Sequence, residues 1–213
     1  MSQKHETPFQ LVRGVKVADL SGVHEGYSLL HAQEGYWVFT VNVSAENLKR
    51  DFYRLAGEVS GRGFLVLERG TPKAVEEKLR KRPSDPLHVD VYYLDGQTWA
   101  TVKPLIERFE ETLFCDGEIN FGYGSHVNND EVFVGAYKRI AIYAVDPQKY
   151  ETALRELGIP REDALRTVWD TLSPSNPGSR HALKDTPFTI QQVFEHLEPK
   201  GLHFAEHRLD RDP

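Results

Sequence analysis

Three strand-like runs follow one another with only short connections in the second half of the chain. They cover residues 119–123, 131–134 and 139–145, and each is rich in the β-branched and aromatic residues typical of strands. Glycine-rich or polar turns separate them. Connections this short join antiparallel neighbours, because a parallel pair needs a much longer crossover. The chain is therefore expected to build an antiparallel sheet here.

Further runs of both kinds predict an α+β fold. Strand composition also occurs at 36–43, 64–68 and 87–94, and all six strands are expected in a single mixed, mainly antiparallel sheet. Apolar residues three and four positions apart predict amphipathic helices that flank this sheet, with those at Leu48 and Leu105 packed against it. The expected helices cover residues 44–59, 71–82, 102–113, 147–157, 165–172 and 190–197.

The carboxy-terminal region is expected to be mainly helical. Residues 173–186 begin with a serine- and proline-rich stretch and are expected to form a loop before the last helix. Residues 202–209 are either a short closing strand or a tail. The patterns together predict one α+β domain over residues 1–213.

The charge balance distinguishes between classes of partner. The 213 residues include 32 acidic and 26 basic side chains, which gives a net charge of −6. A negative protein repels a phosphate backbone, so this balance argues against a general nucleic-acid binder. It favours a basic protein partner instead.

Several features predict a cytoplasmic protein that does not bind membranes. No stretch approaches the roughly 20 apolar residues that a membrane span requires, and the charged amino-terminal residues do not form an export signal. The single cysteine, Cys115, cannot form an internal disulfide, as expected in a reducing compartment. It follows a helix end rather than beginning a helix, so it is expected to be a core thiol and not a nucleophile. The oligomeric state stays open.

The segment 121–131 combines glycines, aromatic rings and titratable groups. No helix pattern follows Ser125, which argues against a phosphate-binding loop, and the serine lacks the flanking glycines of an esterase elbow. His126 with Asp130 or Glu131 forms a candidate pair of general base and orienting carboxylate. These three residues are the candidate catalytic groups, although solvated surface is the more common role of such a loop.

Neither a metal nor a cofactor is expected. His88 and Asp90 share a strand face, and His203 and His207 lie four residues apart. A metal site needs three or four converging ligands, and no zinc or two-histidine-one-carboxylate spacing occurs in the sequence.

Three aromatic side chains near turns are candidates for a partner surface. Trp99, Tyr123 and Tyr137 lie where a large rigid ring can contact a partner, and rings at such positions also pack at sheet edges. Trp37 and Trp169 lie in apolar patterns and are expected in the core.

Two functional hypotheses follow from these observations. The general profile, an acidic αβ domain without a catalytic signature, is similar to that of many bacterial immunity proteins, which neutralise toxins by docking them. The preferred hypothesis is accordingly a non-catalytic, cytosolic binding or inhibitory protein with a basic protein partner. The alternative is a small-molecule enzyme or ligand-binding domain that uses the glycine-rich segment 121–131.

Overall fold

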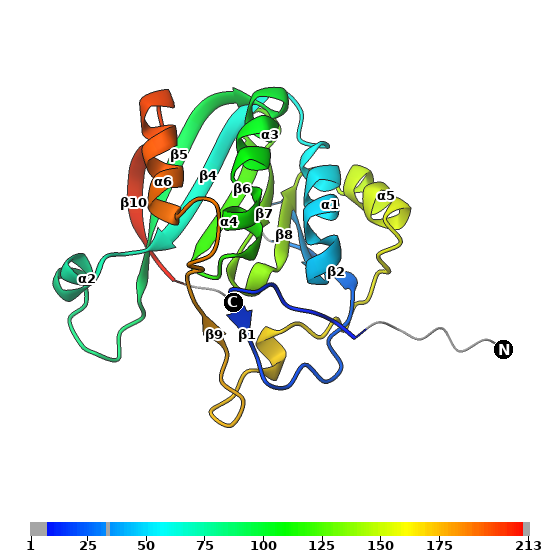
Figure 1. The fold of residues 1–213 in the computed structure, drawn as a ribbon. Coiled ribbons are helices and arrows are strands. Elements are labelled where there is room, and N and C mark those ends of the chain that lie inside the picture. Colours follow the sequence, from blue (N-terminus) through cyan, green and yellow to red (C-terminus); the bar gives the residue numbers. More distant parts are fainter. Residues whose placement is uncertain (1–7, 33–34, 211–213) are drawn as a thin grey trace.

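An eight-stranded antiparallel sheet forms the centre of the protein. The structure, a computed structural model, describes residues 8–32 and 35–210 (Figure 1). The strand order is β10-β5-β4-β6-β7-β8-β3-β2, and β1 and β9 form a separate two-stranded antiparallel sheet. The strands are β1 (Val15–Lys16), β2 (Gly26–His31), β3 (Trp37–Asn42), β4 (Arg62–Gly70), β5 (His88–Thr98), β6 (Ile119–Ser125), β7 (Asp130–Val134), β8 (Ile140–Ala144), β9 (Ser179–Arg180) and β10 (His203–Leu209).

Helices cover one face of the large sheet. The helices α1, α3, α4, α5 and α6 lie over this face in Figure 1, whereas α2 projects beyond the edge of the sheet near β5. The helices are α1 (Ala45–Ala56), α2 (Lys73–Leu79), α3 (Trp99–Arg108), α4 (Glu110–Cys115), α5 (Gln148–Glu156) and α6 (Ile190–Leu197). Short 3-10 turns occur at η1 (Ala136–Lys138), η2 (Trp169–Thr171) and η3 (Glu198–Lys200). In the described ranges, no helix is both long and apolar enough to span a membrane.

The main core lies between the sheet and these helices. Successive side chains of a strand point to opposite faces, so every second residue of β6 enters this core, including Phe121 and Tyr123. Leu48, Phe52 and Leu55 of α1 lie in the same core. Their spacing of three and four residues places them on one side of the helix. This burial explains why the helix forms against the sheet even though its mean composition is polar.

The second face of the large sheet carries no helix in the part of the chain that the structure describes (Figure 1). We call it the open face. Some of its side chains are buried by their neighbours on the same face. Phe64, Val66 and Val91 form a small buried cluster, and the rings of Tyr93 and Phe133 pack on it. The open face includes Ser28, Leu30, Val38, Thr40, Phe64, Val66, Glu68, Val89, Val91, Tyr93, Asn120, Glu131, Phe133, Ala141, Tyr143, Glu206 and Arg208.

The structure confirms the α+β class and corrects its details. The sheet is entirely antiparallel rather than mixed, and the small β1–β9 sheet is additional. The carboxy-terminal region is not mainly helical, because β10 pairs with β5 at the edge of the sheet after α6. The helix expected at 165–172 is only the short turn η2, and the expected loop 173–186 contains β9.

A buried lysine holds the beginning of β6 in place. The Lys138 ammonium donates hydrogen bonds to the carbonyl oxygens of Leu113, 2.9 Å away, and Ile119, 2.6 Å away. These bonds join the last turn of α4 to the first residue of β6, and burial lowers the pKa of Lys138 to about 7. The contact fixes the start of the strand that carries Asn120 onto the open face.

The glycines of β6 make room for aromatic rings on the open face. A Cβ atom at Gly122 would lie 2.8 Å from the Phe133 ring and 2.8 Å from the Val132 carbonyl oxygen. At Gly124 it would lie 2.6 Å from the Phe64 ring. The glycines therefore let two rings lie flat across the strand, and they serve packing rather than a phosphate-binding turn.

Replacing Gly122 should destabilise the fold. We expect Gly122→Ala to lower the free energy of unfolding by about 1–3 kcal/mol, because the Phe133 ring and the neighbouring backbone must move apart. Gly70→Ala is the matched control, since no heavy atom lies within 4 Å of a Cβ there. Urea unfolding of both variants measures the difference, and equal stabilities would contradict this account of the glycines.

Candidate functional site on the open sheet face

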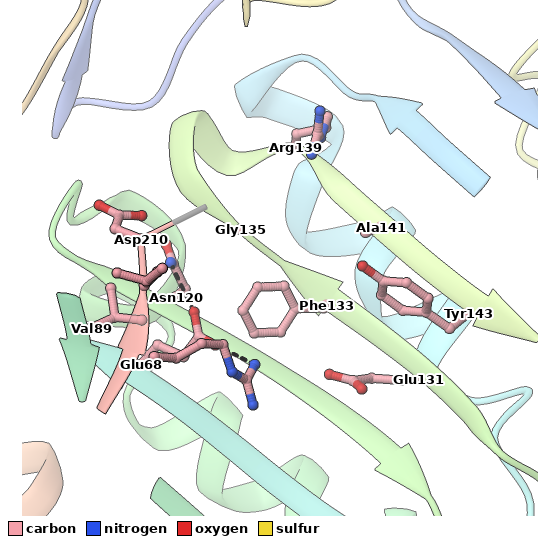
Figure 2. Close-up of a pocket in the computed structure, with 12 residues that line it drawn as sticks. Glu68, Val89, Asn120, Glu131, Phe133, Gly135, Arg139, Ala141, Tyr143 and Asp210 are labelled. Carbon is pink, nitrogen blue, oxygen red and sulfur yellow. Dashed lines mark hydrogen bonds and ion pairs between the residues drawn. The ribbon is translucent and has the colours of Figure 1, made fainter. Parts of the chain in front are cut away.

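A hollow of about 250 Å³ lies in the middle of the open face. Its walls combine carboxylates, two arginines (Arg139 and Arg208), an amide and rings, contributed by β4, β5, β6, β7, β8 and β10 and by the segment between β7 and β8. Figure 2 shows the Phe133 ring between Glu68 and Asn120 on one side and Glu131 and Tyr143 on the other. The strand register alone brings these residues together, because they are distant in sequence.

Glu68 is fully engaged inside the hollow. Arg208 donates from Nη1 to Glu68 Oε1 at 3.2 Å, and Asn120 donates from Nδ2 to Glu68 Oε2 at 3.3 Å. The same guanidinium also donates to Glu206 at 2.7 Å and to the Tyr93 hydroxyl at 3.4 Å. Arg208 and Glu68 therefore satisfy each other and define one wall of the site.

Glu131 is differently placed. Within the described chain its carboxylate makes no hydrogen bond or ion pair, although the side chain is half-buried. Burial and then the negative charge of Glu68 raise its pKa to about 7, and the positive charge of Arg208 opposes this shift only in part. An anion at Glu131 is thus destabilised in the free protein and would be stabilised by an arriving cation or hydrogen-bond donor.

A second polar group in the hollow also lacks a partner. Asn120 is only 6% exposed, and its Oδ1 atom accepts no hydrogen bond from the described residues. A buried carbonyl oxygen without a donor lowers the stability of the fold, and this atom is covered by its neighbours. The half-buried carboxylate of Glu131 is therefore the unpartnered group that a ligand can reach.

An apolar row continues from the hollow towards the β2 edge. Glu131 pairs in register with Tyr143, Tyr143 with Val38, and Val38 with Leu30. Leu30 is 68% exposed and Tyr143 37% exposed, and the half-buried Val38 lies between them. The open face therefore presents an acidic hollow beside an exposed apolar row.

The three candidate catalytic residues do not come together. Asp130 and Glu131 point to opposite faces because they are neighbours on β7. Asp130 is buried on the helix side, where Lys149 forms an ion pair with it. His126 is exposed, and its ring packs on Phe64 with centroids 4.5 Å apart. Of the three residues, only Glu131 lines the hollow.

The predicted partner-binding rings are also dispersed. Tyr123 is fully buried in the main core, below Trp99 at a centroid distance of 5.3 Å. Tyr137 packs against Trp169, 4.8 Å away, next to the small β1–β9 sheet. Trp99 and Tyr137 are each half-buried at separate places, so the three rings do not form one surface.

The histidines pair with carboxylates rather than gathering around a metal. His88 Nδ1 lies 3.1 Å from Glu76 and His207 Nδ1 lies 2.8 Å from Asp90, while His203 lies 3.6 Å from Asp95. In the described ranges, no group of three or more histidine, cysteine or acidic side chains has the arrangement of a metal site.

Sequence reasoning missed most of the hollow. Glu68, Asn120, Tyr143 and Arg208 belong to four different strands, and nothing in their local sequence marks them. The available signal was strand alternation, which places Glu68 on the same face as Phe64 and Val66 once β4 is assigned. The order of the strands in the sheet was also needed, and the sequence does not provide it.

Comparison with known proteins adds no assignment. No protein-family model, no curated protein and no solved structure shows a significant match to this chain. Its function must be argued from the geometry.

A tyrosine on each face of the sheet provides a test of this geometry. We expect Tyr123→Ala to lower the free energy of unfolding by about 3–5 kcal/mol, since it empties a buried ring position. Tyr143→Ala on the open face should cost much less, because Tyr143 is 37% exposed. Thermal and urea unfolding of the two variants compare them directly, and equal losses would contradict the assignment of the two faces.

The raised pKa of Glu131 predicts a pH-dependent stability. The folded protein releases this proton near pH 7 and the unfolded chain near the ordinary value of 4.5, so the folded state binds the extra proton between these values. The stability contributed by this group is therefore lost as pH rises from about 4.5 through about 7. Glu131→Gln removes this titration. As pH rises over the interval, the free energy of unfolding of the variant should therefore increase relative to that of the unmodified protein. Urea unfolding of both proteins at pH 4.5 and pH 7 measures this difference. A stability difference that stays the same at the two pH values would contradict the raised pKa of Glu131.

Proposed function

We propose that this protein is a non-catalytic binding or inhibitory protein that docks a basic protein partner on the open face. The observation that carries this proposal is the combination of an unsatisfied carboxylate, Glu131, with the adjoining exposed row of Tyr143, Val38 and Leu30. Buried apolar contacts supply most of the stability of protein complexes, and unpaired charges supply specificity. The open face offers both.

The charges of the hollow support a basic partner. The hollow is lined by three acidic residues, Glu68, Glu131 and Asp210, and by two basic residues, Arg139 and Arg208, so it carries one net negative charge when Glu131 is ionised. The whole chain carries the same sign, with a net charge of −6. A partner with a positive surface would be attracted at a distance and would then neutralise the hollow on contact.

Docking of this kind is sufficient for inhibition. A protein bound across a flat, broad sheet face covers its partner's surface without any chemical step, as in the toxin-neutralising role that the composition suggests. The scattered positions of His126, Asp130 and Glu131 favour such a role over general acid–base catalysis by these three residues.

One observation favours the alternative of a small-molecule enzyme. A carboxyl group with a pKa of about 7 close to a second, ion-paired carboxylate resembles the acid and base pairs of enzymes. However, Arg208 and Asn120 occupy both oxygens of Glu68, which leaves Glu131 as the one carboxylate in this pair that is open to a ligand. Turnover abolished by Glu131→Gln without loss of fold would favour the enzyme.

A charge placed in the apolar row should abolish docking. We expect Leu30→Lys to weaken the complex with a basic partner, recovered by affinity purification from the source cells, by at least tenfold, or about 1.4 kcal/mol. The variant removes an apolar contact and adds a like charge. Leu30 is 68% exposed, so the fold should be retained.

Leu87→Lys is the matched control for docking. It makes the same change at a leucine that is 54% exposed and precedes β5, at the opposite edge of the sheet from β2 and outside the row of Tyr143, Val38 and Leu30. The partner should bind this variant as it binds the unmodified protein, and its association should slow as salt is added. A partner that binds Leu30→Lys equally well would refute docking on the open face.

A further inference from the structure

We infer that the protein has a second interaction surface, which binds an acidic protein segment that carries an apolar side chain. This surface is formed by residues 71–87, which connect β4 to β5 and include α2, and we call them the α2 arm. The arm projects beyond the edge of the sheet (Figure 1). The inference is independent of docking on the open face, because the apolar row of that face ends at Leu30 on β2, the strand at the far edge of the sheet.

The α2 arm is basic within an acidic protein. It contains five basic and three acidic residues, whereas the whole chain has a net charge of −6. Among the described residues, the arm has one ion pair between its own basic and acidic side chains, from Lys73 to Glu77 at 3.9 Å. Arg80, Lys81 and Arg82 follow one another without a carboxylate partner in the same ranges. Neighbouring like charges repel each other, so an acidic ligand would relieve this repulsion.

A groove of about 480 Å³ lies beside these cations. Leu87, which is 54% exposed, and the exposed Pro83 form its apolar part. Arg80 joins α2 to the residues that follow it, because its Nη2 atom donates a hydrogen bond to the Pro83 carbonyl oxygen. Lys81 and Arg82 line the groove as well, so apolar and positive side chains stand together there.

The acidic side chains of the arm are already engaged. Glu76 lines the groove, but it is buried, accepts a hydrogen bond from the backbone N–H of His88 and lies 3.1 Å from the Nδ1 atom of the same residue. Glu77 lines it too, beside Lys73. Asp85 accepts hydrogen bonds from two backbone N–H groups of the arm, at 3.0 and 2.8 Å. These contacts leave the three consecutive cations uncompensated.

The base of the arm is tied to the sheet. The Thr71 hydroxyl donates a hydrogen bond to Asp90 at 2.6 Å, and the Thr71 backbone N–H donates to the His88 carbonyl oxygen at 3.1 Å. A groove held in this way is formed before a ligand arrives, which lowers the entropic cost of binding.

An acidic protein segment with an apolar side chain fits both parts of the groove. Its carboxylates would pair with the guanidinium and ammonium groups, and its apolar side chain would cover Leu87. A nucleic acid presents phosphates without such a side chain, and the negative charge of the whole chain repels it. The surface therefore favours a peptide segment over a phosphate polymer.

Three peptides with blocked termini test the inference. Their sequences are Glu-Glu-Leu-Glu-Glu, Gln-Gln-Leu-Gln-Gln and Glu-Glu-Ser-Glu-Glu, so the second lacks the charges and the third lacks the apolar side chain. Each is titrated to about 20 mM into ¹⁵N-labelled protein at about 0.15 M salt, so that millimolar dissociation constants are measurable. We expect the first peptide to shift the backbone amides of Lys81, Arg82 and Leu87, and the other two to bind at least about fivefold more weakly.

Two charge-reversal variants complete the test. Lys81→Glu combined with Arg82→Glu should weaken binding of the acidic leucine peptide at least tenfold, or about 1.4 kcal/mol. Lys184→Glu combined with Lys200→Glu makes the same change of net charge outside the arm and should leave this binding nearly unchanged. All four side chains are exposed, so both variants should retain the fold.

The remaining outcomes decide against the inference or limit it to the arm. Equal binding of the three peptides, unaltered binding by Lys81→Glu with Arg82→Glu, or shifts that do not involve the arm would each overturn it. Tighter binding of a DNA duplex of about 12 base pairs, or of phosphatidylserine vesicles, would also overturn it, since the arm would then recognise phosphate. Leu30→Lys lies outside the arm and should bind the acidic leucine peptide as the unmodified protein does.

Discussion

The alternation of side chains along β6 determines the organisation of both faces of the sheet. Phe121 and Tyr123 point into the core beneath the helices, and Gly122 and Gly124 leave space on the other side. The rings of Phe133 and Phe64 occupy that space and bury the centre of the open face. A sheet stabilised in this way needs no second layer of helices, so its open face can retain charged side chains and a hollow.

The hollow differs from an ordinary polar surface because its groups are unequally satisfied. Glu68 accepts hydrogen bonds from Asn120 and Arg208, whereas Glu131 and the Asn120 Oδ1 atom have no hydrogen-bond partner among the described residues. Unsatisfied polar groups in a folded protein reduce its stability, and sites of this kind are typical of surfaces that another molecule completes. The row ending at Leu30 adds exposed apolar area beside the hollow, and the docking proposal depends on it.

The sequence predicted the individual elements better than their assembly. All six predicted strand runs are strands, because their β-branched and aromatic residues are buried in a sheet. The β2 strand was missed, since Leu30 and His31 at its end are exposed and blur the alternation. At 165–172 the apolar residues pack without a helix: Leu165 contacts the backbone region of Gly26, and only η2 is helical. Glu131 was found from its local sequence, but its convergence with Glu68 and Asn120 depends on strand order, which short-range patterns do not contain.

The pairing of β3 with β8 has a consequence for how the chain matures during synthesis. Phe39 pairs with Ile142, so β3 acquires this neighbour only after about two thirds of the chain has been made. Until then the β2–β3 hairpin and α1 can form locally, but one edge of β3 stays unpaired, with Phe39 and Val41 beside it. An unpaired apolar edge is a site of association between nascent chains. The arrival of β8 therefore covers this edge of β3, whereas the outer edge of β5 is covered only later, when β10 has been made.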